Sequence, residues 1–548
     1  LLNFSHFSQK QFISLLEIFK DLQEKNEKLP FLFIEDQVID AIKEEVLKEA
    51  FILKQMFIEN DNASDRVKKM FYYNSFDEFI ESSFLKYQKF EDHSWFKKAF
   101  NETNETQYKV VREKLETFYK LQSQYNLNQL SSIYEKFKSF KQRFNRQKNY
   151  LTFSDIANLV FELLQDKIQS DFLYFRLDST YNHILIDEFQ DTSLLQYKIL
   201  KPLIDEVFAG KGQSFKTFFY VGDIKQSIYR FRGGKSDLFD YLKIDFPKLE
   251  VKDLNTNYRS SEKIVSFVNE IFLKVPNYDM VHQYSKKDGG YVEVKGVEKD
   301  FGSTKEFEEI LTTIEMLLSK GLDPNEIAIL TYNNKDVLNI YNYLKEKLPN
   351  IDITTDMTSK LINASNIKAM INYIKYFYFN EDIYKANFNS LMGIEIDNEI
   401  TYKINIKTNN LKQICYLVAT HYKLFDQNML KFLELLENYS DVVDFIYHVD
   451  NEEAIMENES QKGISILTIF KSKGLEFNTV LLVDRISKKT NDKSTLLFEY
   501  DGIKLDQVHY KIKNKEFFDT KFNEALEKEK ILSNLDDLNV LYVALTRA

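Results

Sequence analysis

Residues 184–192 read ILIDEFQDT, an apolar run that ends in two adjacent acids. Such a run is typical of a buried strand in an α/β sheet, and these sheets bind ligands at the carboxyl ends of their strands. Asp187 and Glu188 therefore stand where a ligand is expected. A carboxylate like that of Asp187 can hold a magnesium ion, and one like that of Glu188 can orient a water molecule for attack on a phosphate.

Length and charge limit the kind of protein. The chain has 548 residues, which is too long for one hydrophobic core and predicts several folding units. Its 73 Lys+Arg and 84 Asp+Glu give a net charge of -11, which argues against indiscriminate coating of nucleic acid but allows binding in a local basic groove. No apolar run approaches the roughly 18 residues of a membrane span. Cys415 is the only cysteine, so we expect a reducing, cytoplasmic compartment.

Helical and α/β segments alternate along the chain. Residues 1–150 carry apolar side chains at helical spacing. From residue 151 onward, short apolar runs alternate with helical patterns, which predicts parallel sheets. Residues 360–455 are again helical and interrupt two strand-rich segments. The expected strands are 183–186, 218–221, 249–254, 291–297, 327–331, 464–468 and 480–483.

The segment 218–234, FFYVGDIKQSIYRFRGG, repeats the arrangement of a strand followed by an acidic loop. Gln226 is placed to reach a terminal phosphate from this neighbouring strand end. Tyr229, Phe231 and Arg232 alternate aromatic and basic groups, which can stack on unpaired bases and hold their phosphates. Such a run alone is more often a packed loop, and it is the neighbouring blocks that favour nucleic-acid binding.

Three later blocks place charged residues beside strands or helices. In LNTNYRSS, Arg259 could reach a γ-phosphate as an arginine finger, or it could form a surface salt bridge. In ILTIFKSKGLEFNTVLLVD, Lys473 and Gly474 precede Glu476, and lysines in such a loop suit a nucleic-acid backbone. NVLYVALTRA predicts a helical segment that places Arg547 at its end.

In this order the blocks resemble the motifs of superfamily 1 helicases of the UvrD/Rep type. DEFQDT is similar to motif II, VGDIKQSIYRFRGG to motif III, NYRSS to motif IV, TIFKSKGLEF to motif V and LYVALTRA to motif VI. KQSIYRFRGG and KSKGLEF resemble more closely the AddA/RecB branch, the helicase-nuclease subunits of bacterial double-strand break repair. The resemblance covers about 151–270 and 460–548 well.

The resemblance implies an α/β fold with two RecA-like parallel-sheet motor domains and helical accessory subdomains. Residues 1–150 would form a helical accessory region, and 151–253 the remainder of the first motor domain. Residues 254–359 and 456–548 would form the second motor domain, with 360–455 inserted as a helical subdomain. Members of the family couple ATP hydrolysis to 3′-to-5′ movement along single-stranded DNA. The implied ligands are ATP, Mg²⁺ and DNA, and the implied partner is an AddB-like subunit.

The resemblance also implies catalytic roles. Asp187 would bind magnesium, Glu188 would activate water, and Gln226 would sense the γ-phosphate. Arg259 and Arg547 would act as two arginine fingers.

Further residues are implied to contact the nucleotide or the DNA. Tyr258 would stack on the adenine. Glu476 would contact the ribose, and Gly474 belongs to the same nucleotide-binding loop. The implied DNA track consists of Tyr229, Phe231, Arg232 and Lys473.

Three features depart from the family pattern. The phosphate-binding motif I, GxxxxGK[ST], is absent: residues 234–236 read GKS, but Tyr229 stands at the position of its first glycine. Phe470 replaces the usual histidine of motif V. Tyr332 stands where relatives of this branch often carry arginine.

Two explanations of the missing motif I are open. The chain could be part of a longer protein with motif I upstream of Leu1 and a nuclease domain after Ala548, or its ATP site could be degenerate. We favour the first, because motifs II, III, IV and VI keep their reactive side chains. The predicted function is thus an ATP-dependent DNA helicase of an AddAB- or RecBCD-like complex, inactive as this chain alone. The alternatives are a stand-alone UvrD-like repair helicase and a non-catalytic DNA-binding or assembly module.

Overall fold

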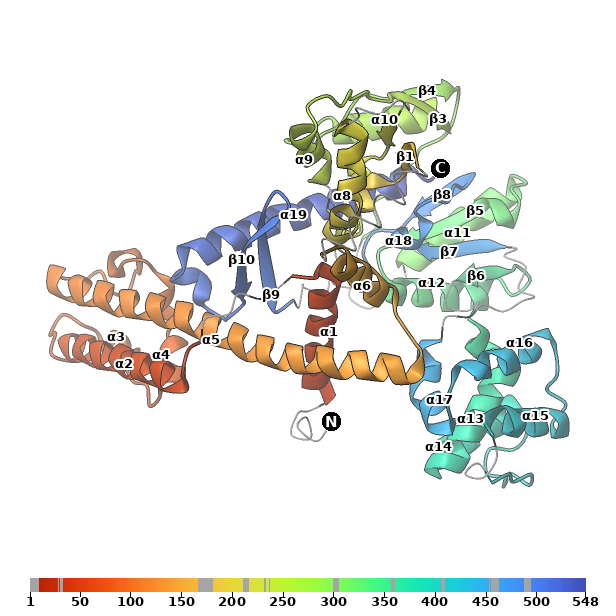
Figure 1. Ribbon diagram of the computed structural model, residues 1–548, viewed down its shortest axis with the longest axis horizontal. Helices are drawn as coiled ribbons and strands as arrows, with labels where there is room; N and C mark the ends of the chain where they lie inside the picture. The colour runs from red at the N-terminus through yellow and green to blue at the C-terminus, as the bar shows by residue number, and fades with distance from the viewer. Residues whose placement is uncertain are drawn as a thin grey trace. The chain divides into compact units, whose positions relative to one another are not determined.

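The chain divides into two compact units in the computed structural model (Figure 1). Unit 1 comprises Leu1–Asp253 and Asn491–Leu541, and unit 2 comprises Leu254–Thr490 and Tyr542–Ala548. No helix in the described part of the chain is both long and apolar enough to cross a bilayer. The structure describes residues 9–27, 29, 33–165, 181–209, 216–230, 233–235, 237–298, 305–355, 360–405, 410–452, 454, 463–486 and 494–548.

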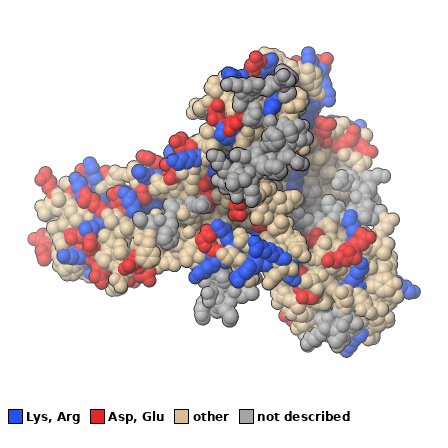
Figure 2. All heavy atoms as spheres, viewed as in Figure 1, with Lys and Arg blue, Asp and Glu red and all other residues tan. Residues whose placement is uncertain are grey.

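The helical part of unit 1 is built on a pair of long helices. α2 (Asp36–Ile58) packs against α5 (Glu102–Lys148), as the helical spacing in this region predicts. Their shared core is rich in phenylalanine, and the rings of Phe57 and Phe71 stack with their centroids 4.7 Å apart. Figure 2 shows acidic and basic side chains intermingled on the visible face of these helices. The smaller helices of this part are α3 (Asp65–Lys69), α4 (Phe76–Ile80), η2 (Ser83–Lys86) and η3 (Phe90–Asp92).

The α/β part of unit 1 holds a parallel strand pair. β1 (His183–Ile186) and β2 (Thr217–Tyr220) lie where the sequence predicts strands, β2 one residue earlier than expected. One face packs on a core that includes Phe189, whereas Leu185 and Phe219 on the other face are 70% and 58% exposed. The surrounding helices are α6 (Phe153–Gln165), η4 (Phe189–Asp191), α8 (Leu194–Ala209), η5 (Ile224–Gln226) and α9 (Leu238–Asp245).

Residues 491–541 belong to unit 1, although they fall within the second motor domain that the sequence predicts. Leu496 and Val508, from an antiparallel hairpin, share a core with Phe19 and Leu127. Apolar contacts with the amino-terminal helices therefore hold this segment in unit 1. Its elements and the helix of Phe19 are β9 (Leu496–Asp501), β10 (Lys504–Tyr510), η11 (Lys515–Phe517), α19 (Thr520–Leu545) and α1 (Gln9–Lys25).

A four-stranded parallel sheet is the centre of unit 2, in the order β6-β7-β5-β8. Every residue of β5 is buried, as expected of a central strand with both faces covered. The predicted strands at 327–331 and 464–468 are confirmed, and that at 480–483 begins one residue earlier. The elements are β5 (Ile327–Thr331), β6 (Ile353–Thr355), β7 (Ile464–Thr468), β8 (Thr479–Leu482), α11 (Lys305–Ser319), η7 (Pro324–Glu326), α12 (Asn334–Lys347) and α18 (Ile469–Ser472).

Two predicted strands are wrong. Neither 249–254 nor 291–297 forms a strand, and Leu254 and Val294 are exposed. Alternating apolar residues form a strand only where a neighbour offers backbone hydrogen bonds, and these segments pair with no strand among the described residues. The parallel pair in this part of unit 2 is instead β3 (Thr256–Ser261) with β4 (Tyr284–Lys287), and α10 (Glu262–Phe272) connects the two.

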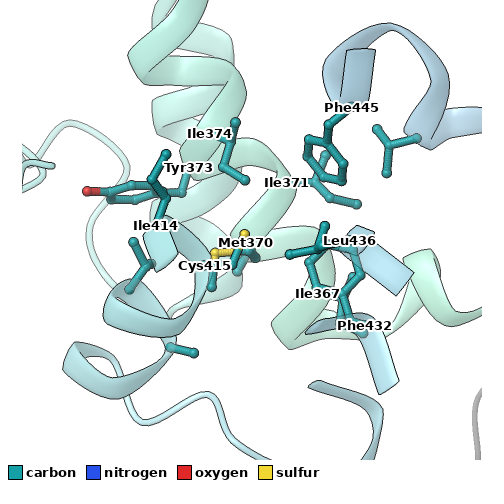
Figure 3. Close-up of a cluster of buried hydrophobic side chains, with 14 of the residues drawn as sticks. Ile367, Met370, Ile371, Tyr373, Ile374, Ile414, Cys415, Phe432, Leu436 and Phe445 are labelled. Carbon is teal, nitrogen blue, oxygen red and sulfur yellow. The ribbon is translucent and has the colours of Figure 1, made fainter. Parts of the chain in front are cut away.

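Unit 2 also contains a helical region with its own core. Figure 3 shows Met370, Tyr373 and Phe445 among the side chains that fill it. Cys415 lies there fully buried, and burial raises the pKa of its thiol, so it packs as a small apolar side chain. Its elements are η8 (Leu361–Asn363), α13 (Ser365–Phe379), α14 (Asp382–Leu391), α15 (Leu411–His421), α16 (Gln427–Leu435), η9 (Leu436–Asn438), α17 (Val442–His448) and η10 (Val449–Asn451).

Asp155 at the start of α6 ties that helix to α5. Its carboxylate accepts hydrogen bonds from the Thr152 amide at 3.0 Å and from Asn145 Nδ2 at 3.1 Å, and lies 2.8 Å from Lys141 Nζ. Burial alone would raise the pKa of Asp155, but the bonds from Lys141 and Thr152 outweigh it and lower the pKa to about 2. The ionised carboxylate therefore stabilises the folded chain.

We expect Asp155→Asn to lower the free energy of unfolding by about 2 kcal/mol at neutral pH. Because the folded pKa lies below the usual value, this contribution is present above pH 3.8 and is lost as the pH falls from 3.8 toward 2. Urea unfolding across this pH range measures the gap in the free energy of unfolding between wild type and variant. Asp40→Asn, on the exposed surface of α2, is the control. A gap that stays constant down to pH 2 contradicts the assignment.

Candidate functional site

Two carboxylates follow β1 in unit 1. β1 and β2 are parallel, with Ile186 opposite Tyr220, so the residues after both strands meet at one edge of the pair. Asp187 Oδ1 accepts a hydrogen bond from the Glu188 amide at 2.8 Å. Glu188 has a left-handed backbone with φ of 50°, which turns the chain sharply into η4. Both acids are exposed, as a ligand site requires.

Gln190 joins this acidic turn to the loop after β2. Its side chain is 1% exposed, Nε2 donates to Glu188 Oε2, and Oε1 accepts from the Asp223 amide at 3.1 Å. A Cβ at Gly222 would lie 2.2 Å from Gln190 Oε1, so a larger residue there would displace this side chain. Gln190 is not among the predicted site residues, although its place two residues after Glu188 in DEFQDT could have indicated it.

Gln226 lies in the same hydrogen-bonded chain. Its Nε2 donates to Asp223 Oδ2 at 3.2 Å, while Lys225 Nζ pairs with Asp223 Oδ1 at 2.7 Å. Asp223 also accepts from the Lys225 amide and so begins η5. The structure thus links Glu188, Gln190, Asp223 and Gln226 at one strand edge, and their catalytic roles stay predictions.

The predicted DNA track is only partly described. Tyr229 is half-buried at the end of the loop after η5, whereas Phe231 and Arg232 lie outside the described residues. Lys473 is half-buried and follows α18 in unit 2. Their roles stay predictions.

Unit 2 brings the predicted guanidinium groups and Glu476 together. Arg259 Nε donates to Glu476 Oε2 at 3.0 Å. Arg547 Nη1 donates to the Leu475 carbonyl at 3.3 Å, and the Phe477 amide donates to the Arg547 carbonyl at 2.9 Å. One short segment therefore contacts both arginines.

The side chains of Arg259 and Arg547 differ in solvent exposure. Arg259 lies inside β3, which pairs with β4, whereas the sequence predicts a strand at 249–254 that would end before it. Its side chain is partly exposed, whereas Arg547 is only 1% exposed. Tyr258 beside Arg259 is 71% exposed, and Gly474 adopts φ of 84°, which favours glycine in the turn before Glu476.

The donor set suits a magnesium nucleotide. Mg²⁺ keeps several waters and is usually held by one or two carboxylates together with substrate phosphates. Asp187 offers such a carboxylate at an exposed strand end. Within the described ranges there is no group of three or more His, Cys, Asp or Glu side chains of the kind that holds a tightly caged metal.

Two family models cover almost the whole chain. The model for the UvrD/REP helicase N-terminal domain matches residues 8–247. The model for the UvrD-like helicase C-terminal domain matches residues 253–392 and 395–548. Because these matches agree with the motifs, the parallel sheets and the strand-edge carboxylates, the chain belongs to the UvrD-like helicase family.

Curated relatives include helicase-nuclease subunits. An ATP-dependent helicase/nuclease subunit of Lactobacillus helveticus (strain DPC 4571) is 23% identical over 521 residues, which is 74% of this chain and 42% of the relative. The RecBCD enzyme subunit RecB of Buchnera aphidicola subsp. Acyrthosiphon pisum (strain APS) is 25% identical over 529 residues, 78% of this chain and 42% of the relative. YjcD of Bacillus subtilis (strain 168), named as an ATP-dependent DNA helicase, is 26% identical over 414 residues, 65% of this chain and 52% of the relative. The chain thus spans about half the length of these relatives.

Proposed function

We propose that this chain supplies the catalytic carboxylates, arginine fingers and DNA contacts of an ATP-dependent 3′-to-5′ DNA helicase. The observation that carries the proposal is the linked set of Glu188, Gln190, Asp223 and Gln226 at one strand edge. Such a set can hold a catalytic carboxylate and a phosphate sensor in a fixed relation to one another.

In unit 1 each side chain has a distinct task. Glu188 orients the attacking water and accepts its proton, and Gln190 fixes the carboxylate by donating to Oε2. Gln226 donates to the γ-phosphate. Asp187 would hold Mg²⁺, which neutralises charge on the phosphates.

In unit 2 the exposed ring of Tyr258 suits stacking on a base. Arg259 stabilises the charge that develops on the transferred phosphoryl group. Glu476, which pairs with Arg259 in the structure, accepts from the ribose when nucleotide binds, and Gly474 gives the backbone its turn. Arg547 is the second finger, and its guanidinium donates to the backbone carbonyls of Val543 and Leu475.

We further propose that the chain works as the helicase component of an AddAB- or RecBCD-like helicase-nuclease, with an AddB-like partner. The names of the relatives from Lactobacillus and Buchnera support this assignment. A non-catalytic DNA-binding module is the second candidate, because the sequence contains no GxxxxGK[ST] motif.

Phosphate release with and without single-stranded DNA tests the proposal. We expect the 548-residue chain alone to hydrolyse ATP negligibly, because it lacks the loop that cradles the β- and γ-phosphates. The full-length gene product is expected to hydrolyse ATP with DNA stimulation. DNA-stimulated turnover by the chain alone contradicts the first expectation. A full-length gene product that binds DNA but hydrolyses no ATP supports the non-catalytic module instead.

Single-strand binding tests the DNA track. We expect Phe231→Ala to weaken binding by about 1–3 kcal/mol, because a stacking platform loses its contact with a base. Fluorescence anisotropy with labelled oligonucleotide at fixed salt gives the Kd. Tyr72→Ala, which removes an exposed ring from the helical part of unit 1, is the control. An unchanged Kd for Phe231→Ala removes this residue from the track.

A further inference from the structure

The loop that carries Gln226 is anchored on α19 by a buried amide. Asn539 is 8% exposed, and its Nδ2 donates to the carbonyls of Ile224 at 3.3 Å and Ser227 at 3.0 Å. These two carbonyls flank Gln226 on either side. Ser227 is also buried, and its hydroxyl donates to the Gln190 carbonyl at 3.4 Å. The loop is therefore held between the acidic turn and α19.

A second anchor lies at the far end of the same loop. Arg230 Nη1 and Nη2 each donate to one carboxylate oxygen of Glu529 at 2.9 Å. Its Nε donates to Asp536 Oδ2 at 2.7 Å. This fork-to-fork pairing is among the strongest geometries available to an arginine and a carboxylate. The Arg230 guanidinium therefore binds two carboxylates of α19, although its place in an aromatic-basic run would suggest a phosphate contact.

Gln226 lies between the two carbonyls that Asn539 holds, and Tyr229 lies between that first anchor and Arg230. Displacement of Tyr229 would pull on Arg230, and displacement of the loop backbone would break the bonds to Asn539. Each movement would change where the Gln226 amide points. A shift of only about 1 Å at such a group can lower a rate by around a hundredfold.

We propose that Asn539 and Arg230 are positioning residues that clamp the Gln226 loop onto α19 and set the orientation of its amide. This inference rests on the proposed function, because it gives Gln226 its task at the γ-phosphate. The clamp makes Gln226 respond to the DNA contact at Tyr229 through one rigid loop.

The test uses three clamp variants and one matched control. Asn539→Leu removes both N–H donors of the side-chain amide at similar volume. Arg230→Gln removes the bidentate guanidinium, and Glu529→Gln removes the negative charge from the carboxylate that pairs with it. Glu527→Gln is the control, because Glu527 lies exposed two residues from Glu529 on the same helix. Hydrogen exchange of 224–230 in the 548-residue chain reports the loop, and ATP turnover of the full-length gene product reports the chemistry.

We expect faster exchange of 224–230 and a kcat at least about tenfold lower in the clamp variants, with KM for ATP and Kd for DNA within about twofold of wild type. The control should match wild type in every measurement. Unchanged exchange, or unchanged kcat despite faster exchange, overturns the clamp. A fall in kcat together with higher KM and Kd and a lower urea-unfolding midpoint also overturns it, since that result describes a purely structural role. Absence of turnover in wild type refutes the proposed function, while the exchange result still decides whether the clamp exists.

Discussion

Replacing Glu188 with Gln is expected to abolish ATP turnover in the full-length gene product while nucleotide binding persists. Glutamine has the shape of glutamate, so its side-chain oxygen can still accept from Gln190 Nε2. It cannot take a proton from water, and loss of a general base costs typically about 10²–10⁴-fold in rate. Single-turnover hydrolysis with saturating DNA gives the rate, and binding of a fluorescent ATP analogue gives the affinity.

The matched control for this variant is Glu250→Gln, which neutralises another exposed glutamate of unit 1. It should leave both rate and affinity unchanged. Undiminished turnover in Glu188→Gln would remove Glu188 from catalysis. Loss of nucleotide binding in the same variant would instead assign Glu188 to the binding of the nucleotide.

Arg259→Ala is expected to lower kcat by about 10³–10⁵-fold, the range that an arginine finger contributes. The guanidinium is partly exposed, and it forms an ion pair with Glu476, which is also exposed. A surface pair of this kind contributes about 0–1 kcal/mol to stability, so the variant should fold normally. Steady-state hydrolysis gives kcat, and urea unfolding checks the fold.

Lys263→Ala, which removes an exposed charge from the following helix α10, serves as the control for Arg259. Arg259→Lys is the sharper comparison, because lysine keeps the charge but not the planar fork. Recovery of full activity by lysine would mean that charge alone is needed. Wild-type activity in Arg259→Ala would show that Arg259 is no arginine finger and that its role is limited to the salt bridge with Glu476.

The sequence predicts strands well where their apolar side chains are buried on both faces. The predicted bounds of β5 and β7 agree with the structure to the residue, because IAILT and ISILT are largely apolar runs. The sequence does not predict β3, which reads TNYRSS, because its residues are largely polar. It forms a strand by pairing with β4, which lies more than twenty residues further along the chain. The 249–254 and 291–297 segments have the right pattern but pair with no described strand.

The candidate site likewise contains residues that local sequence patterns reveal and contacts that they do not. The positions of Asp187, Glu188 and Gln226 follow from strand ends, which local patterns reveal. The clamp formed by Arg230 and Asn539 does not, because its contacts span about 300 residues of sequence and depend on how α19 packs. The pairing of Arg259 with Glu476, at a separation of 217 residues, is equally invisible to local patterns.

The open side of the β1–β2 pair has a practical consequence for handling the protein. Leu185 and Phe219 lie side by side in register with most of their surface in water. A two-stranded sheet is only marginally stable by itself, and uncovered apolar surface promotes self-association. Concentrated solutions of the chain should therefore precipitate on warming. Its thermal stability would then be described by the rate at which folded protein is lost rather than by a reversible Tm.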